Sequence, residues 1–245
     1  MSEKRFDAVF ISDLHLHPQE PAILSRFHTF TDWAAKNTES VYILGDFFHV
    51  WPGDDLQAPW SDAIAARLKW LAGEGVALFF MRGNRDFLVG ERFAQAAHLT
   101  LLKEPTQIKL GEEQILLVHG DRYCTEDKSH QWFRKLTRNW WFPALFLRLP
   151  LGFRIRLVAK VRQHSQMNRR KTPLQMDVVV KHLLTHLQSQ KVTTVIHGHT
   201  HKPALSNHWY NEVNYRQFVL SDWDDNPQLL CYNKTNGLKF YHNCF

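Results

Sequence analysis

Residues 6–16 read FDAVFISDLHL, an apolar run that ends in Asp13 and His15. A short continuous run rich in Phe, Val and Ile is typical of a strand buried on both faces. The pattern returns in SVYILGD at residues 40–46 and in VALFFMR at residues 76–82, and the segments between these runs have helical spacing. Strands and helices in alternation predict right-handed crossovers and a parallel sheet, with ligands at the carboxyl ends of the strands.

The second half of the chain has a different order of elements. Residues 106–121, TQIKLGEEQILLVHGD, predict a β-hairpin that turns at Gly111. Residues 125–190 have mostly helical spacing, which prolines must break into separate helices. KVTTVIHGHTH at residues 191–201 predicts a strand and a histidine-rich loop, and the tail from NYRQFVLSD to LKFYHN alternates as a small antiparallel sheet would. Because mixed α/β domains often reach this length, we expect a single domain over residues 1–245.

Composition limits the partner and the compartment. The formal charge of +6 and a pI near 9.3 favour an anionic partner, which could be nucleic acid, anionic lipid or a phosphorylated small molecule. The first residues, MSEKRFDAVFISD, fit neither a signal peptide nor a spanning helix, so we expect a cytoplasmic protein. The cysteines stand at wide spacing, which favours reduced thiols and no disulfide framework.

Polar clusters follow the predicted strands at five places. They are Asp13-Leu-His15, Gly45-Asp46, Gly83-Asn84-Arg85-Asp86, His119-Gly120-Asp121 and His197-Gly198-His199-Thr-His201. Five such clusters at strand ends would bury many imidazoles and carboxylates together unless a cation compensated them. The alternative is a set of satisfied core histidines and ordinary turns. Carboxylate and amide oxygens with imidazole nitrogens suit Mn²⁺, Fe²⁺ or Zn²⁺, so the sequence predicts a metal centre.

The order D-x-H, G-D, G-N-x-D, H-G-D and G-H-x-H resembles that of the calcineurin-like metallophosphoesterases over nearly the whole chain. Within that superfamily, the segments FISDLHL, YILGDFFHVWPGDD, GNRDFLVGERFA, LVHGDRYCTED and IHGHTHKP resemble the UDP-2,3-diacylglucosamine pyrophosphatase family of lipid A biosynthesis. The resemblance implies a four-layer α/β/β/α sandwich with a helical cap inserted over residues 125–190. It also implies two Mn²⁺ ions per chain.

The same resemblance assigns metal ligands by position. The first ion would be held by Asp13, His15, Asp46 and His199, and the second by Asp46, Asn84, His119 and His197. Asp46 would bridge the two ions, since a carboxylate can share its two oxygens between cations. His201 lies beyond the ligand pair, and we expect it to support a ligand or to face solvent.

The resemblance implies hydrolysis of the pyrophosphate bond of UDP-2,3-diacylglucosamine to UMP and 2,3-diacylglucosamine 1-phosphate (lipid X). Two cations about 4 Å apart lower the pKa of a shared water, so we expect metal-held hydroxide to attack the α phosphorus without a phosphoenzyme. Ser12 is then a hydrogen-bonding residue and no nucleophile. Many superfamily members carry a histidine where this chain carries Arg85. A phosphate leaving group needs no proton from that position, and we expect Arg85 and Asn84 to act on phosphate oxygens in catalysis.

The predicted cap is rich in Trp, Phe and Leu, with Arg and Lys between them and little acid. Ordinary helix packing would use such residues, but so would a helix that lies on an anionic membrane surface. Together with the family resemblance, this composition of the predicted cap favours acyl-chain binding and peripheral contact with the cytoplasmic face of the inner membrane. The residues that the resemblance places against the substrate are Asn84, Arg85, Asp127, Ser165, Asn168 or Arg169, Lys171 and His197.

Two other functions stay open from the residues alone. A metallophosphoesterase for a cyclic nucleotide or nucleic acid would share the metal clusters, but a nuclease should present an open basic groove in place of the run WFPALFLRLPLGF. A basic membrane-docking or nucleic-acid-docking protein with a purely structural metal is the non-enzyme alternative, although structural sites are usually closed four-ligand cages. We expect a monomer that binds a lipid-linked UDP-sugar and no nucleic acid.

Overall fold

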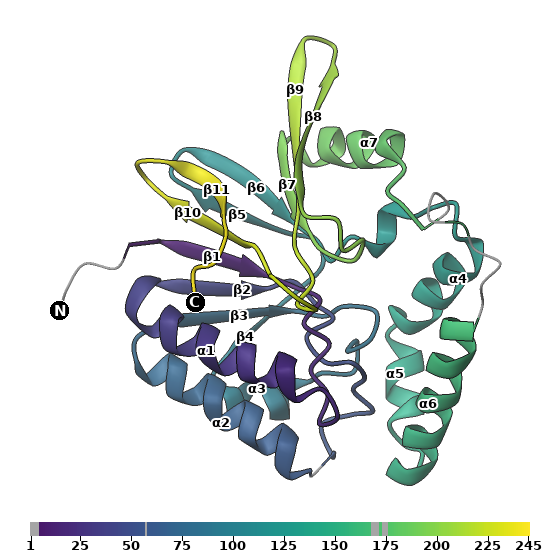
Figure 1. The fold of residues 1–245 in the computed structure, drawn as a ribbon. Helices are drawn as coiled ribbons and strands as arrows, with labels where there is room; N and C mark the ends of the chain where they lie inside the picture. Colours follow the sequence, from purple (N-terminus) through teal and green to yellow (C-terminus); the bar gives the residue numbers. More distant parts are fainter. Residues whose placement is uncertain (1–4, 57, 168–171, 173–175) are drawn as a thin grey trace.

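The computed structural model describes residues 5–56, 58–167, 172 and 176–245. Two β-sheets pack face to face and carry helices on their outer faces (Figure 1). The first sheet has the order β11-β10-β1-β2-β3-β4, from β1 (Ala8–Ile11), β2 (Ser40–Ile43), β3 (Ala77–Met81), β4 (Thr100–Leu102), β10 (Leu229–Asn233) and β11 (Gly237–Tyr241). The second has the order β5-β6-β7-β9-β8, from β5 (Thr106–Leu110), β6 (Glu113–Leu117), β7 (Thr194–His197), β8 (Ala204–Tyr210) and β9 (Val213–Val219).

The helices fall into three groups (Figure 1). The outer face of the first sheet is covered by α1 (Pro21–Asn37), α2 (Pro59–Gly73) and α3 (Glu91–Ala97). The outer face of the second sheet is covered by α7 (Val180–Gln190), which packs there with the short helix η1 (Asp121–Tyr123). To one side of both sheets lie α4 (Lys128–Thr137), α5 (Trp141–Phe146) and α6 (Leu151–Met167).

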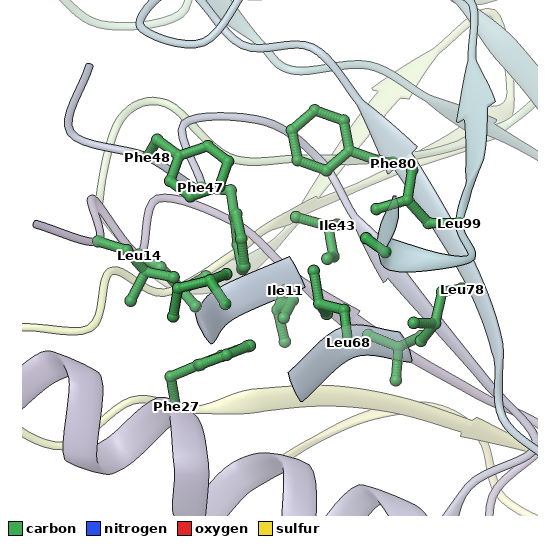
Figure 2. Packing of buried hydrophobic residues seen from close by; sticks show 14 of the residues in the cluster. Ile11, Leu14, Phe27, Ile43, Phe47, Phe48, Leu68, Leu78, Phe80 and Leu99 are labelled. Carbon is green, nitrogen blue, oxygen red and sulfur yellow. The ribbon is translucent and has the colours of Figure 1, made fainter. Parts of the chain in front are cut away.

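Alternating side chains on the strands divide the core into layers, because successive residues of a strand point to opposite faces. In β1, Val9 packs toward α1 and α2, whereas Phe10 packs between the sheets. In β6, Leu117 packs between the sheets and Leu116 packs toward α7. Figure 2 shows the first of these layers, where side chains from the strands meet Phe27 of α1 and neighbouring apolar residues.

The predicted four-layer α/β/β/α sandwich is confirmed. The strands β1, β2, β3 and β4 are parallel, as the alternation of strands and helices predicts, and the hairpin of β5 and β6 turns at residues 111–112. The inserted segment proposed at 125–190 contains α4, α5, α6 and α7, and of these α7 forms the fourth layer.

The expectation of one small antiparallel sheet for the tail is wrong. β9 pairs in parallel with β7 in the second sheet, while β10 pairs with β1 in the first. Phe218 of β9 and Leu230 of β10 meet in the core between the sheets from opposite sides. Alternation in the sequence marks each tail strand and its buried face, but it does not say which strand will be its neighbour. The strand β8 was not expected at all.

Candidate metal centre

The loops that follow five strands meet at one end of the two sheets. Asp13 follows β1 and Asp46 follows β2, and the His15 backbone N–H donates to the Asp46 carbonyl at 3.0 Å. The second sheet brings His119 after β6 and the histidines after β7, where the Gly198 N–H donates to the His119 carbonyl at 2.9 Å. Because these strands are neighbours in their sheets, residues far apart in sequence become adjacent.

The carboxylate of Asp46 lies between two histidines. Its Oδ2 is 3.5 Å from Nε2 of His15, and its Oδ1 is 3.6 Å from Nε2 of His119. The side-chain oxygen of Asn84 is 3.0 Å from the same His119 nitrogen. A carboxylate with one oxygen toward each of two ligand groups has the arrangement that a bridging ligand needs.

Two groups of three side chains in the described part of the chain have ligand atoms within 4.8 Å of one another. They are Asp13, His15 and His201, and Asp46, His119 and His199. Oδ1 of Asp13 and Nε2 of His15 are buried and have no hydrogen-bond partner among the described residues, which is costly unless a cation completes them. The donor set therefore fits two divalent cations, with Asp46 between them.

The ligand assignment by position differs from these groups at the histidines after β7. His201 lies with Asp13, at 3.4 Å from Nε2 to Oδ1, in the place predicted for His199. His197 is buried and belongs to neither group. Its Nδ1 donates to the Gly198 carbonyl, and its Nε2 lies 2.9 Å from the amide nitrogen of Gln217. Gln217 could not be found from the sequence, because the pairing of β9 with β7 was not predicted.

Burial keeps the imidazoles of His197 and His199 neutral, which is the form that binds metals. It lowers the pKa of His197 to about 4 and that of His199 to about 3, where the charge of His119 adds to the effect. Burial alone would raise the pKa of Asp13, but the nearby His201 imidazole and the charge of His119 outweigh it and bring the pKa to about 2. At neutral pH, neutral imidazoles and an ionised carboxylate are the species that coordinate a cation.

The backbone at the site is strained. Asp13, His15, Asp46 and His199 all have positive φ, between 51° and 72°. Residues other than glycine rarely adopt this region, and such residues cluster at functional sites where the surrounding structure holds them. These turns follow strand ends and bring Nε2 of His15 to 4.0 Å from Oδ1 of Asp13 and to 3.5 Å from Oδ2 of Asp46.

Asp86 connects two of the ligand loops, a role that its place in the Gly-Asn-Arg-Asp cluster did not reveal. Its buried carboxylate accepts the backbone N–H of Phe47 at 2.8 Å and that of Gly83 at 2.7 Å. These donors belong to the loops after β2 and β3, which carry Asp46 and Asn84. The carboxylate of Asp86 therefore fixes the distance between two predicted ligands and does not need to touch a metal itself.

The helix α4 is tied to the site by ion pairs. Arg134 donates from Nε to Asp121 at 3.1 Å and from Nη2 to Glu104 at 3.2 Å. Glu104 also accepts the backbone N–H of His119. On the same helix, the ring of His130 lies 5.1 Å from that of His199. The first helix of the predicted cap thus forms one wall of the site.

A cavity of about 470 Å³ extends from the site between the loop after β3 and the helices α4, α5 and α6. At one end it is lined by Asn84 and Arg85, and Nε of Arg85 is 3.2 Å from Oδ2 of Asp46. Farther away the lining is apolar, from Phe87, Trp132, Phe133, Leu136, Phe142, Phe146, Leu157, Val158 and Val161. The guanidinium group beside the metal centre and the mainly apolar lining suit a ligand that combines phosphate with a hydrophobic group.

The residues predicted to touch the substrate are only partly described. Asn84, Arg85 and His197 lie at the site. Asp127 is buried and precedes α4, where its carboxylate accepts the His130 N–H at 3.0 Å. Ser165 belongs to the last turn of α6, and its side chain is outside the described part; Asn168, Arg169 and Lys171 lie outside the described residues altogether.

The family model for the calcineurin-like phosphoesterases matches residues 7–203, a range that includes every one of the converging loops. The chain belongs to this family. It is 42% identical over 224 residues to the UDP-2,3-diacylglucosamine hydrolase of Aromatoleum aromaticum, covering 91% of each chain. It is 41% identical over 223 residues to the protein of the same name from Pectobacterium carotovorum, covering 91% of this chain and 93% of the relative. A third phosphoesterase of that name, from Shigella dysenteriae, is 40% identical over 216 residues, covering 88% and 90%.

Membership in the phosphoesterase family confirms the resemblance on which the sequence interpretation depends, and the relatives are hydrolases by name. Within the described residues, no helix is both long enough and apolar enough to pass through a bilayer.

Proposed function

We propose that this phosphoesterase hydrolyses the pyrophosphate bond of UDP-2,3-diacylglucosamine in lipid A biosynthesis, giving UMP and 2,3-diacylglucosamine 1-phosphate. The main support is the cavity that joins a cationic, metal-binding end to an apolar body under the helical cap. The names of relatives that match about nine tenths of the chain point to the same substrate.

We propose two Mn²⁺ ions, held by Asp13, His15, Asp46, Asn84, His119, His197 and His199. Two such cations, when bound, supply Lewis acid chemistry: they lower the pKa of a shared water and draw charge from the phosphorus oxygens. His201 is the residue to test beside His199, because its Nε2 already lies close to Asp13.

The chain's own residues would orient the diphosphate. Asn84 stands at the polar end of the cavity, and its amide can hold a phosphate oxygen or a cation. The Arg85 side chain is only 20% exposed, and its guanidinium can form charge-assisted hydrogen bonds with the phosphate under attack. Asp127, Ser165, Lys171 and either Asn168 or Arg169 are proposed contacts for the nucleotide sugar.

The apolar body of the cavity would hold the acyl chains, and the outer faces of α4, α5 and α6 would rest on the inner membrane. Several large apolar side chains on these helices or next to them are exposed, including Trp132, Trp140, Leu145 and Phe153. Basic side chains stand between them, as in helices that lie at an anionic lipid surface. We therefore propose a peripheral protein that works as a monomer on the cytoplasmic face.

The decisive experiment is to incubate the purified protein and Mn²⁺ with UDP-2,3-diacylglucosamine in detergent and to follow UMP and the lipid phosphate. The wild type should release both products in equal amounts. Asp46→Ala and Asn84→Ala should each lose at least about 100-fold in rate, because each removes a cation ligand. Faster hydrolysis of a cyclic nucleotide or of single-stranded nucleic acid than of the lipid substrate would contradict the proposal.

A further inference from the structure

Helix α6 turns one narrow face toward the rest of the molecule. Over residues 152–163 every side chain is exposed except those of Arg154, Val158 and Arg162, which recur at intervals of four residues. This i, i+4, i+8 spacing defines one face of a helix. Arg154 is buried and pairs with Asp55, and Val158 packs against the core of the first sheet. Arg162 is therefore held on the inward face, two turns beyond a fixed anchor.

The guanidinium of Arg162 has no anionic partner in the part of the chain that the structure describes. Its Nε is buried and meets no hydrogen-bond acceptor. Burial, the larger cause, and the charge of Arg85 together lower the pKa of Arg162 to about 10, against the opposing effect of Asp46. A half-buried cation without a counter-charge is unfavourable, so an anion that reached this position would be bound favourably.

Arg162 and Arg85 line the same cavity from opposite elements. Arg85 comes from the loop after β3 and is tied to the metal centre through Asp46, whereas Arg162 comes from the cap. The charges of both arginines act on His49. Burial is the largest cause that lowers the pKa of His49 to about 4, and the charges of Arg85 and then Arg162 add to it. Two guanidinium groups therefore line this cavity, and the one on the cap is near enough to Arg85 and Asp46 for their charges to shift its pKa.

We propose that Arg162 binds the second phosphate of a diphosphate substrate, the one nearer the cap, while Arg85 and the metal centre hold the first. This inference rests on the proposed function for its diphosphate. In that reaction a water oxygen bonds to the first phosphorus, and the bond from this phosphorus to the bridging oxygen breaks. The bonding electrons leave with the bridging oxygen on the second phosphate, and a proton from the water passes to solvent. Arg162 offsets the negative charge that grows on this leaving phosphate.

The test compares two arginines of the same helix. Arg162→Met removes the inward guanidinium, and Arg156→Met removes an exposed one whose Nε donates to the Gly152 carbonyl. With UDP-2,3-diacylglucosamine, kcat should fall roughly 10- to 100-fold in Arg162→Met and stay within twofold of wild type in Arg156→Met. Arg162→Lys keeps the charge but cannot form the bidentate hydrogen bonds of a guanidinium, so its kcat should lie between those of the wild type and Arg162→Met.

A binding measurement separates this inference from the proposed function. Calorimetry on the Mn²⁺-loaded protein would use methylenediphosphonate, whose two phosphonates water does not separate, and methylphosphonate, which has only one. Arg162→Met should weaken the diphosphonate about tenfold and leave methylphosphonate unchanged. If the wild-type protein does not hydrolyse the lipid substrate, but Arg162→Met still weakens binding of the diphosphonate alone, the proposed function is wrong and the role of Arg162 is supported. Equal diphosphonate binding by wild type, Arg162→Met and Arg162→Lys overturns the inference.

Discussion

At the scale of single residues, the site depends on small residues that let ligand side chains approach. Gly198 separates His197 from His199, and a Cβ atom built on it would overlap Oδ2 of Asp13 and Oγ of Ser12. Ser12 itself donates to Asp13 at 2.6 Å, in keeping with its assignment as a hydrogen-bonding residue. The glycine between the two histidines is therefore required by close approach of β7 to the end of β1.

We expect Gly198→Ala to destabilise the protein by about 1–3 kcal/mol, because either the loop or the Asp13 side chain must move. Metal affinity should fall as well, since the same carboxylate is a predicted ligand. Urea denaturation without metal and elemental analysis after dialysis against Mn²⁺ would measure the two effects. Gly152→Ala in α6 is the control: nothing lies within 4 Å of its built Cβ, and alanine should stabilise the helix by about 0.5–1 kcal/mol.

His186 of α7 supplies a pH-dependent part of the stability. Its Nδ1 shares a hydrogen bond of 2.8 Å with the Tyr123 hydroxyl, and burial, with the charges of Arg122 and Arg134, lowers its pKa to about 4. The unfolded chain takes up a proton near pH 6.5 and the folded chain only near pH 4. This contribution is therefore complete above pH 6.5 and is lost as the pH falls toward 4.

His186→Gln should reduce the pH dependence over that range, because glutamine can accept the same hydrogen bond but does not titrate. The measurement is the free energy of unfolding of both proteins in urea at pH 7 and at pH 4.5. The loss between the two pH values should be smaller in the variant. An identical loss in both proteins would show that His186 titrates alike in the folded and unfolded states.

At the scale of elements, charged contacts add to apolar packing in attaching the predicted cap to the sandwich. α4 is held through Arg134, and α6 through Arg154, which donates to the Pro52 carbonyl and to Asp55. These contacts lie on loops that also carry the site, so the position of the cap and the shape of the cavity are linked.

Arg154→Met should lower the free energy of unfolding by about 1–3 kcal/mol, because the Pro52 carbonyl loses its charged donor. Local opening should increase more in α6 than in α1. Hydrogen exchange of the backbone amides, followed by mass spectrometry, would compare the two helices. Asp55→Asn keeps Arg154 in place with one weaker partner and should have a smaller effect. Uniform loss of protection in both helices would contradict a separate anchor for the cap.

The positions of the tail strands in the two sheets depend on tertiary packing, which local sequence patterns do not predict. The repeats of strand and helix up to α3 predict a parallel sheet, since each helix must return the chain to the same edge. The tail carries no such constraint: β9, β10 and β11 are short, alternate well and can pair in several ways. Their division between two sheets follows from the core that both sheets share.

At the scale of the whole molecule, exposed tryptophans lie both on the predicted cap and on the β8–β9 hairpin. Trp132 and Trp140 on the cap side are 67% and 86% exposed, and Trp209 on the β8–β9 hairpin is 72% exposed. The hairpin projects from a different side of the molecule than α4, α5 and α6 (Figure 1). Only the first pair lies among the basic and apolar residues of the proposed membrane surface.

The double substitution Trp132→Ser and Trp140→Ser should weaken binding to phosphatidylglycerol vesicles roughly tenfold, because two large apolar side chains no longer enter the interface. Trp209→Ser should bind as wild type does, and raising the salt concentration should weaken all three. Sedimentation with sucrose-loaded vesicles would measure the bound fractions. An equal loss in Trp209→Ser would place the contact elsewhere.

The sequence by itself determined the strand and helix order of the first half, the family and the converging clusters. Apolar periodicity and strand-end polar residues are local properties of the chain, so they can be recognised without knowing which elements pack together. Only the tertiary structure decided which histidine stands beside Asp13, that Gln217 reaches His197, and that Arg162 faces Arg85. These contacts join side chains from separate elements, so they depend on strand pairing and helix rotation, which are fixed by burial of the whole core.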